Sequence, residues 1–360
     1  MQHPRPRWRR LPASLAAAGL GLGFAGPSQG AGVDEAALTG ALVDRLTPLL
    51  AGMNDESPRY VEVRDGWIYK RSVQLFVALN PELFPGREHR EPSPLREPVE
   101  AIVDARDQLA RAGIELLVVP IPTRLDVYPD AVVDVVLGED FRGYAPGMAK
   151  LLARLRAHDV DALDLLPEFT ARRGTLDGPE DELVFLRANS HWTPKGAVLA
   201  AEALAGSIRE RAWFDASGSD SEATHLERSR AAWTPDDGEL AEGAAPPVLE
   251  FERVVDAEGR PAARSDRSSP VVLWGDSFTT IFEPRGADLP RRLHHALGAA
   301  VDVVASPGGG PHASRAAFAR RHAPLAGKHL VIWAFSANTL IGPNWGEVRL
   351  ERPPPRSRAR

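Results

Sequence analysis

Four short, mostly apolar segments constrain the fold of this chain more than any other feature of its sequence. They lie at residues 115–120, 270–274, 301–304 and 330–335. Apolar runs of this kind are typical of strands that are buried on both faces of a parallel sheet. Between them, apolar residues recur at helical spacing in segments 98–112, 147–157, 194–208, 290–297 and 313–321. Strands that alternate with helices predict an α/β fold with a doubly wound parallel sheet.

In such a sheet, ligands bind outside the carboxyl ends of the strands. The segments that directly follow three of the predicted strands are 275–278, 306–311 and 336–338. We therefore expect these three segments to converge on one crevice, and we look there first for residues that carry chemistry.

The remaining segments have less regular patterns. Residues 209–268 are rich in Asp, Ser, Glu, Gly and Pro, and we interpret them as a partly ordered insertion with one weak strand candidate at 248–255. Residues 351–360 are rich in Pro and Arg and are predicted to form a disordered tail. One folded domain is expected to occupy residues 31–350 around the insertion.

Residues 1–30 have the layout of a secretory signal peptide: four arginines come first, then an apolar run, then small residues. An uncleaved membrane anchor is the alternative, although the apolar run is shorter than the roughly 20 residues that a span needs. We therefore expect a periplasmic or secreted protein.

Composition excludes several classes of function. The formal net charge is −6, and the only basic cluster outside the leader is the short tail, so a nucleic-acid partner is not expected. The chain has no cysteine, which rules out disulfides, thiolate nucleophiles and cysteine-rich zinc sites. No residues stand at metal-ligand spacing, and we predict neither a metal nor a cofactor.

The segment Gly275-Asp276-Ser277 places a serine directly after a predicted apolar strand. A glycine before it permits a tight turn, so the serine projects into the predicted crevice. Its backbone N–H, near the start of a new helix, is a candidate donor to an oxyanion. The alternative is that Ser277 only caps the following helix.

A histidine that can serve as a base stands in the segment 189–197, just before Pro194, a residue favoured in the first turn of a helix. A serine nucleophile needs a base with a pKa near 7, and histidine usually supplies it. Taken alone, His191 fits a structural cap on that helix better than a catalytic base. Its occurrence together with a serine at a strand end favours the catalytic interpretation.

Four sequence blocks resemble the AlgJ and AlgX family of alginate O-acetyltransferases. Residues 275–278 and 189–197 look like the family's Gly-Asp-Ser-Phe and Asp-Thr-His-Trp-Thr signatures. Residues 65–69 look like its Asp-Gly-Trp segment, and residues 119–124 with Tyr128 and Pro129 look like its Val-Pro-x-Pro-x-Lys strand and loop. The order of histidine before serine is likewise that of the family.

The resemblance implies a permuted SGNH-hydrolase-like domain, a three-layer α/β/α sandwich, that moves acetyl groups onto hydroxyls of an exopolysaccharide. It implies that Ser277 is the nucleophile and His191 the base, and that a membrane-bound O-acyltransferase is a possible partner that supplies acetyl. One residue departs from the family, because Asn189 stands where the triad aspartate is expected. Three interpretations of this departure stay open. Asn189 alone is enough to orient His191, another acid such as Asp276 or Asp164 assists it, or the protein is a weak or inactive relative of the family.

The other predicted site residues are expected to bind substrate or stabilise an oxyanion. The glycine-rich segment after residue 304 offers unhindered amides, and its alternative role is that of a flexible loop. An indole can stack on sugar rings. The predicted residues are Gly275, Gly309, Gly310, Trp192 and Arg124. Two other functions stay open: a carbohydrate esterase, and a non-catalytic polysaccharide-binding or assembly protein with a degraded triad.

Overall fold

The computed structural model describes residues 34–50, 60–70, 97–214, 224–234, 245–341 and 345–350. The predicted leader and the predicted disordered tail lie outside these residues. Along the described parts of the chain, no helix combines the length and the apolar character needed to cross a bilayer.

A five-stranded parallel sheet forms the centre of the molecule, with strand order β4-β3-β9-β7-β8. Its strands are β3 (Glu115–Ile121), β4 (Asp161–Ala162), β7 (Val271–Gly275), β8 (Asp302–Ala305) and β9 (Leu330–Ser336). The four predicted apolar segments are β3, β7, β8 and β9, so the predicted parallel sheet is confirmed. Of the strands in this sheet, only β4 was missed, because two residues beginning with an aspartate carry no strand pattern.

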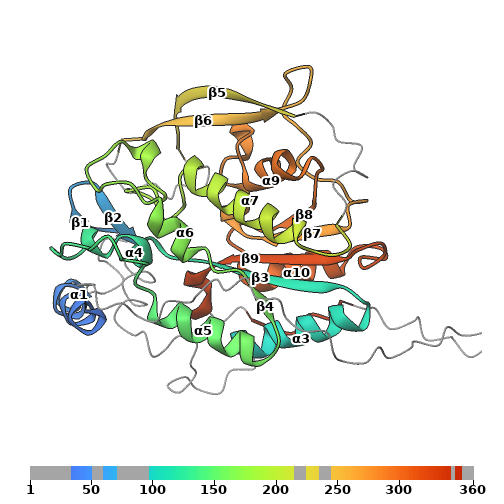
Figure 1. Ribbon diagram of the computed structural model, residues 1–360, viewed down its shortest axis with the longest axis horizontal. Coiled ribbons are helices and arrows are strands. Elements are labelled where there is room, and N and C mark those ends of the chain that lie inside the picture. The colour runs from blue at the N-terminus through green and yellow to red at the C-terminus, as the bar shows by residue number, and fades with distance from the viewer. Residues whose placement is uncertain are drawn as a thin grey trace, which may run out of the picture.

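Helices cover both faces of this sheet and complete a three-layer α/β/α sandwich (Figure 1). One face carries α3 (Pro98–Arg111), α5 (Pro146–Ala157) and α10 (Gly310–Ala319). The other carries α6 (Leu166–Ala171), α7 (Pro194–Arg209) and α9 (Leu289–Leu297). All five helices expected from sequence are present, and the predicted fold class is correct.

Local sequence explains where these helices begin and end. The α3 helix starts at Pro98, and the side chain of Glu97 accepts a hydrogen bond from the amide of Glu100. It stops before Gly113, whose φ of +75° suits glycine. The α7 helix likewise begins with a proline after a capping threonine. The remaining helical elements are the 16-residue α1 (Glu35–Leu50) and the short α4 (Arg124–Val127), η2 (Pro129–Ala131), η3 (Glu180–Glu182), α8 (Ser277–Thr280), η4 (Glu283–Arg285) and η5 (Ala337–Ile341).

Two antiparallel hairpins flank the sandwich. The first pairs β1 (Tyr60–Arg64) with β2 (Trp67–Lys70) around the turn at Asp65 and Gly66, and Gly66 has a φ of +74°. Aspartate followed by glycine is a favoured hairpin turn. The second hairpin pairs β5 (His225–Ala232) with β6 (Val248–Val255) inside the predicted insertion. The weak strand candidate at 248–255 is therefore confirmed as β6.

Candidate active site

Ser277 lies at the turn between strand β7 and helix α8. Asp276 is the N-cap of that helix, and its carboxylate accepts a hydrogen bond of 2.9 Å from the amide of Phe278. The helix turns back directly over the strand end, where a Cβ on Gly275 would lie 1.9 Å from Thr279 Oγ1. Glycine is therefore needed at position 275 to let the turn close, and Ser277 becomes the first helical residue.

His191 is held in a turn just before helix α7. Phe185 and Trp192 form an antiparallel bridge, and the amide of Leu186 donates to the carbonyl of His191 at 3.1 Å. Thr193 follows as the helix cap, and its hydroxyl accepts from the amide of Gly196. The imidazole is thus positioned by a short turn whose two ends are fixed by main-chain bonds.

The serine and the histidine, which lie 86 residues apart in sequence, meet at hydrogen-bond distance. His191 Nε2 lies 2.8 Å from Ser277 Oγ, and His191 Nδ1 lies 2.7 Å from Asn189 Oδ1. His191 and Asn189 are each only 2% exposed, whereas Ser277 is partly open. The structure therefore brings together all three residues predicted to be catalytic.

The hydrogen bonds of Asn189 define the protonation of the imidazole. Asn189 Oδ1 also accepts from the main-chain amide of His191 at 2.9 Å, so the atom that faces this amide must be the oxygen. The same oxygen faces Nδ1, and Nδ1 must then carry a proton. Nε2 is left with a lone pair directed at the hydroxyl of Ser277, which is the arrangement a general base requires.

Neither of the two acids considered as helpers occupies the third position. The carboxylate of Asp276 accepts from the amides of Phe278 and Ser336, the latter at 2.8 Å, and so ties the nucleophile turn to the end of β9. The carboxylate of Asp164 accepts from the amide of Leu166 at 2.9 Å. The group that faces His191 Nδ1 is the neutral amide of Asn189.

We expect the free energy of unfolding to fall as the pH rises from about 4 to about 6, because burial raises the pKa of Asp276 from 3.8 to about 6. The folded chain then holds this proton more tightly than the unfolded chain, so the contribution is complete at low pH and is lost through pH 6. Burial also raises the pKa of Asp126 to about 7, which extends the same trend.

Urea unfolding across this pH range measures the effect. The Asp276→Asn chain should show a flatter profile, by on the order of 2 kcal/mol between pH 4 and pH 6. A profile as steep as that of the wild type would show that Asp276 does not titrate in this range.

The glycine-rich segment adjoins the nucleophile turn. The amide of Ser306 donates to the carbonyl of Gly275 at 3.0 Å, so the ends of β7 and β8 lie side by side. Gly309 does not fit its predicted role, because its amide already donates to the carbonyl of Ser306 at 3.1 Å. Gly310 begins α10 with a φ of +63°, and its role as an oxyanion donor stays a prediction.

Two predicted substrate contacts are wrong in this structure. Trp192 is 1% exposed and packs edge-on against Phe169 and Phe278, so its indole face is not available to a sugar ring. Arg124 is fully buried and bonds to main-chain carbonyls. Both residues lie within the sequence motifs, but both support the site from within the core.

Phe278 is a site residue that the sequence analysis did not single out. Its ring centroid lies 4.7 Å from that of His191 and 5.1 Å from that of Trp192. It therefore forms a wall against the imidazole from the nucleophile side. Its signal was its place as the last residue of the Gly-Asp-Ser-Phe signature, but an apolar residue there is indistinguishable from ordinary core.

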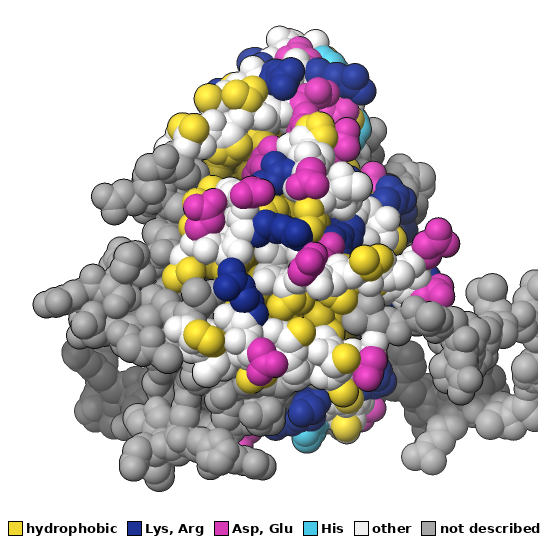
Figure 2. Space-filling model, turned by 90° about the vertical axis from the view of Figure 1, so that its left-hand side faces the viewer, with side chains coloured by type: hydrophobic (Ala, Val, Ile, Leu, Met, Phe, Trp, Pro, Cys, Tyr) yellow, Lys and Arg dark blue, Asp and Glu magenta, His cyan; other side chains and the backbone are white. Residues whose placement is uncertain are grey.

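On the face shown in Figure 2, basic and acidic side chains lie among apolar ones. A cavity of about 830 Å³ lies between residues 135–142 and α6, and neither Ser277 nor His191 lines it. We assign this cavity no part in the chemistry.

Comparison with known proteins gives consistent matches over most of the chain. Residues 61–337 match the family model described as the SGNH hydrolase-like domain of the acetyltransferase AlgX. A relative from Pseudomonas fluorescens, named "Probable alginate O-acetylase AlgJ", is 27% identical over 273 residues, which cover 72% of this chain and 62% of the relative. The protein of the same name from Pseudomonas putida is 27% identical over 302 residues, covering 78% and 70%. This chain thus spans under two thirds of the first relative.

Two solved structures share the fold. The O-acetyltransferase domain of Pseudomonas putida AlgJ superposes with a TM-score of 0.57 at 22% identity, and covers 79% of this chain and 93% of that domain. Pseudomonas aeruginosa AlgX superposes with a TM-score of 0.52 at 20% identity, covering 78% and 66%. At these identities the similarity establishes the fold.

Proposed function

Because this chain belongs to the family of SGNH hydrolase-like acetyltransferase domains represented by AlgX, we propose that it transfers acetyl groups to hydroxyls of a polysaccharide through an acyl-enzyme on Ser277. The observation that carries the proposal is the continuous relay from Asn189 Oδ1 through the His191 ring to Ser277 Oγ, at 2.7 and 2.8 Å. A nucleophile bonded to a base that is oriented by a third group is the arrangement used for covalent acyl transfer.

The proposed reaction has two halves. Ser277 Oγ attacks the acetyl carbonyl while His191 Nε2 takes its proton and then gives it to the leaving group, which leaves acetyl-Ser277. A sugar hydroxyl next attacks this ester, again with His191 as base, and the proton returns to Ser277 as the acetylated sugar departs. In both halves a negative oxygen develops, and the candidate donors to it are the amides of Ser277 and Gly310.

Asn189 has a defined part in this scheme. By accepting from Nδ1 it selects the tautomer that leaves Nε2 free to act as a base. It adds no negative charge to stabilise the imidazolium that forms during attack, and we therefore propose a slower variant of the usual triad chemistry.

The proposal also covers the substrate, the acetyl donor and the location of the protein. The curated relatives are named for alginate, and an exopolysaccharide with free hydroxyls is the proposed acceptor here. A membrane-bound O-acyltransferase is the proposed acetyl source. Residues 1–30, outside the described part of the chain, are proposed to direct export to the periplasm.

The acyl-enzyme is tested directly by incubating the protein with 4-nitrophenyl acetate and analysing its peptides by mass spectrometry. We expect one acetyl group on the peptide that contains Ser277. Adding polysaccharide fragments should then discharge this ester faster than water alone. Discharge by water alone would mean an esterase, and the lack of any adduct under conditions that keep the chain folded would favour a binding or assembly protein.

A further inference from the structure

A fully buried arginine lies behind the histidine turn. Arg124 is the first residue of α4, directly after strand β3, and its side chain is 0% exposed. Burial lowers its pKa, because a charged guanidinium loses its hydration there. A charge buried at this cost needs partners within the protein.

The partners of Arg124 are mostly main-chain carbonyls of one segment. Its Nη1 contacts the carbonyl oxygens of Leu186 at 2.5 Å and Asn189 at 2.9 Å, and also that of Arg187. Its Nη2 bonds to the carbonyl of Ile68 in β2. The guanidinium carbon lies 4.1 Å from the ring centroid of Tyr69, so an aromatic face covers the charge as well.

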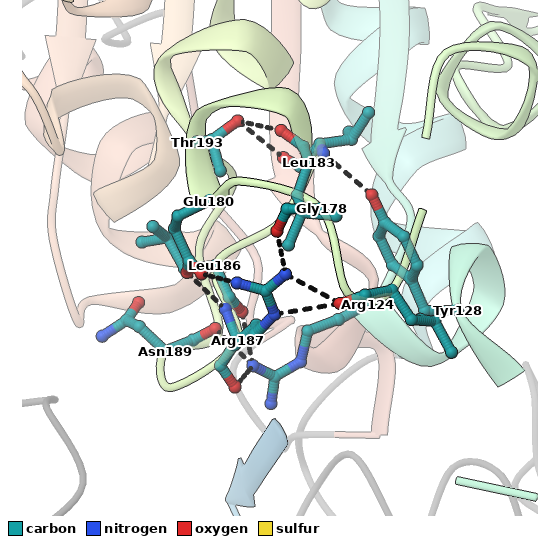
Figure 3. Close-up of polar contacts among 11 residues, drawn as sticks. Arg124, Tyr128, Gly178, Glu180, Leu183, Leu186, Arg187, Asn189 and Thr193 are labelled. Carbon is teal, nitrogen blue, oxygen red and sulfur yellow. Dashed lines mark hydrogen bonds and ion pairs between the residues drawn. The ribbon is translucent and has the colours of Figure 1, made fainter. Parts of the chain in front are cut away.

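The segment 186–189 has no regular secondary structure, and it leads directly into His191. Three of its carbonyl oxygens converge on one point (Figure 3). Converging carbonyl dipoles repel one another unless a cation lies between them. Arg124 supplies that cation, so the shape of this segment depends on the guanidinium.

The same segment carries the residue that orients the imidazole. The carbonyl of Asn189 bonds to Arg124, while its side-chain oxygen bonds to the amide and to Nδ1 of His191. A shift of the Asn189 backbone therefore moves the imidazole relative to Ser277. Misplacing a catalytic group by about 1 Å can cost about 10²-fold in rate.

From these contacts we infer that Arg124 is a positioning residue, which holds the turn of Asn189 and His191 in the geometry that acylation of Ser277 needs. The expected effect on the acylation rate rests on the proposed function. The expected effect on the structure of the turn does not. Arg124 itself touches neither Ser277 nor a reacting atom in this arrangement. It acts through the backbone of Asn189.

The test compares Arg124→Met and Arg124→Lys with changes at Arg292, a second buried arginine. Arg292 is 5% exposed, lies in α9 and pairs at 3.2 Å with Glu252 in β6, whereas Arg124 bonds to the segment before His191. With 4-nitrophenyl acetate, Arg124→Met should lower the acylation rate constant by about 10²-fold and leave KM within about threefold. Arg124→Lys keeps the positive charge but loses the planar guanidinium with its several N–H donors, and it should lower the same rate constant by about tenfold. Arg292→Met and Arg292→Lys should stay near the wild-type rate.

A second readout needs no turnover. The main-chain amide of His191, which is bonded to Asn189 Oδ1, should exchange its hydrogen at least about tenfold faster in the Arg124 variants than in the Arg292 variants. Folding is followed by circular dichroism. If Arg124→Met does not fold, the comparison of Arg124→Lys with Arg292→Lys decides.

The inference is overturned if folded Arg124 variants match the Arg292 variants in both acylation and exchange. If the wild type forms no acetyl-Ser277, the proposed function fails. Faster exchange at His191 in the Arg124 variants would then still support the positioning role, because that measurement is independent of acyl transfer.

Discussion

Ser277→Ala should lower the turnover of 4-nitrophenyl acetate by on the order of 10⁴-fold or more and abolish the acetyl adduct. The hydroxyl removed is the proposed attacking group, and it lies 2.8 Å from the nitrogen that would take its proton. The fold should persist, because this hydroxyl is at a partly open strand-end turn and the loss of one hydrogen bond there costs only about 1 kcal/mol.

The measurement combines steady-state kinetics with peptide mass spectrometry, and thermal unfolding reports on the fold. Ser268→Ala is the matched control, since this exposed serine bonds to Asp266 at 2.7 Å, outside the site. The control should retain both turnover and adduct. Unchanged turnover in a folded Ser277→Ala chain would remove Ser277 from the mechanism.

Asn189→Asp should accelerate formation of the acyl-enzyme by between about 10-fold and about 10⁴-fold, the upper bound being the loss caused by the reverse change in a serine protease. Asn189 Oδ1 already accepts from both the amide and Nδ1 of His191, so a carboxylate fits the same two bonds. Its charge stabilises the imidazolium that forms as Ser277 attacks.

Burial of a new carboxylate would ordinarily be costly. Here the guanidinium of Arg124 bonds to the carbonyl of the same residue at 2.9 Å, so a cation lies close by and offsets part of this cost. We therefore expect the Asn189→Asp chain to fold.

Burst-phase kinetics and the pH–rate profile measure the outcome. The acidic limb of the profile should move to higher pH in Asn189→Asp, because the protonated imidazole becomes more stable beside a carboxylate. Asn189→Ala completes the series and should be slower than the wild type, because it removes the acceptor that selects the tautomer. Equal burst rates with Asn and Asp in folded proteins would show that charge at this position does not limit acylation.

The sequence predicted the central sheet and its major helices because their apolar patterns are local. Strand β5 was not predicted, since residues 225–232 are mostly polar and form a strand only by pairing with β6 over eight residue pairs. Such pairing depends on a partner more than 15 residues away and leaves no periodic signal in the strand itself.

The same difference between local and non-local signals explains why only part of the candidate site was predicted. Ser277 and His191 stand at element boundaries with recognisable turn chemistry, and the structure places them in contact. Burial is not local, however, and Trp192 and Arg124 were assigned to substrate although both lie in the core. A polar or aromatic residue beside a motif can face outward or inward, and only the packing of distant segments such as β2 decides which.

The last strand of the sheet, β9, lies between β3 and β7, and this order has a consequence for how the chain acquires its structure. During synthesis, β3 and β7 emerge first with nothing to join them, and β9 begins only at Leu330. Until then both strands expose open hydrogen-bonding edges. The residues of β3 that pair with β9 are separated from their partners by more than 200 positions in the sequence. Contacts this remote in sequence form slowly. A nascent or truncated chain that stops short of Leu330 would therefore lack the strand that joins β3 to β7. Without a continuous sheet, Ser277 and His191 would not be held at hydrogen-bond distance.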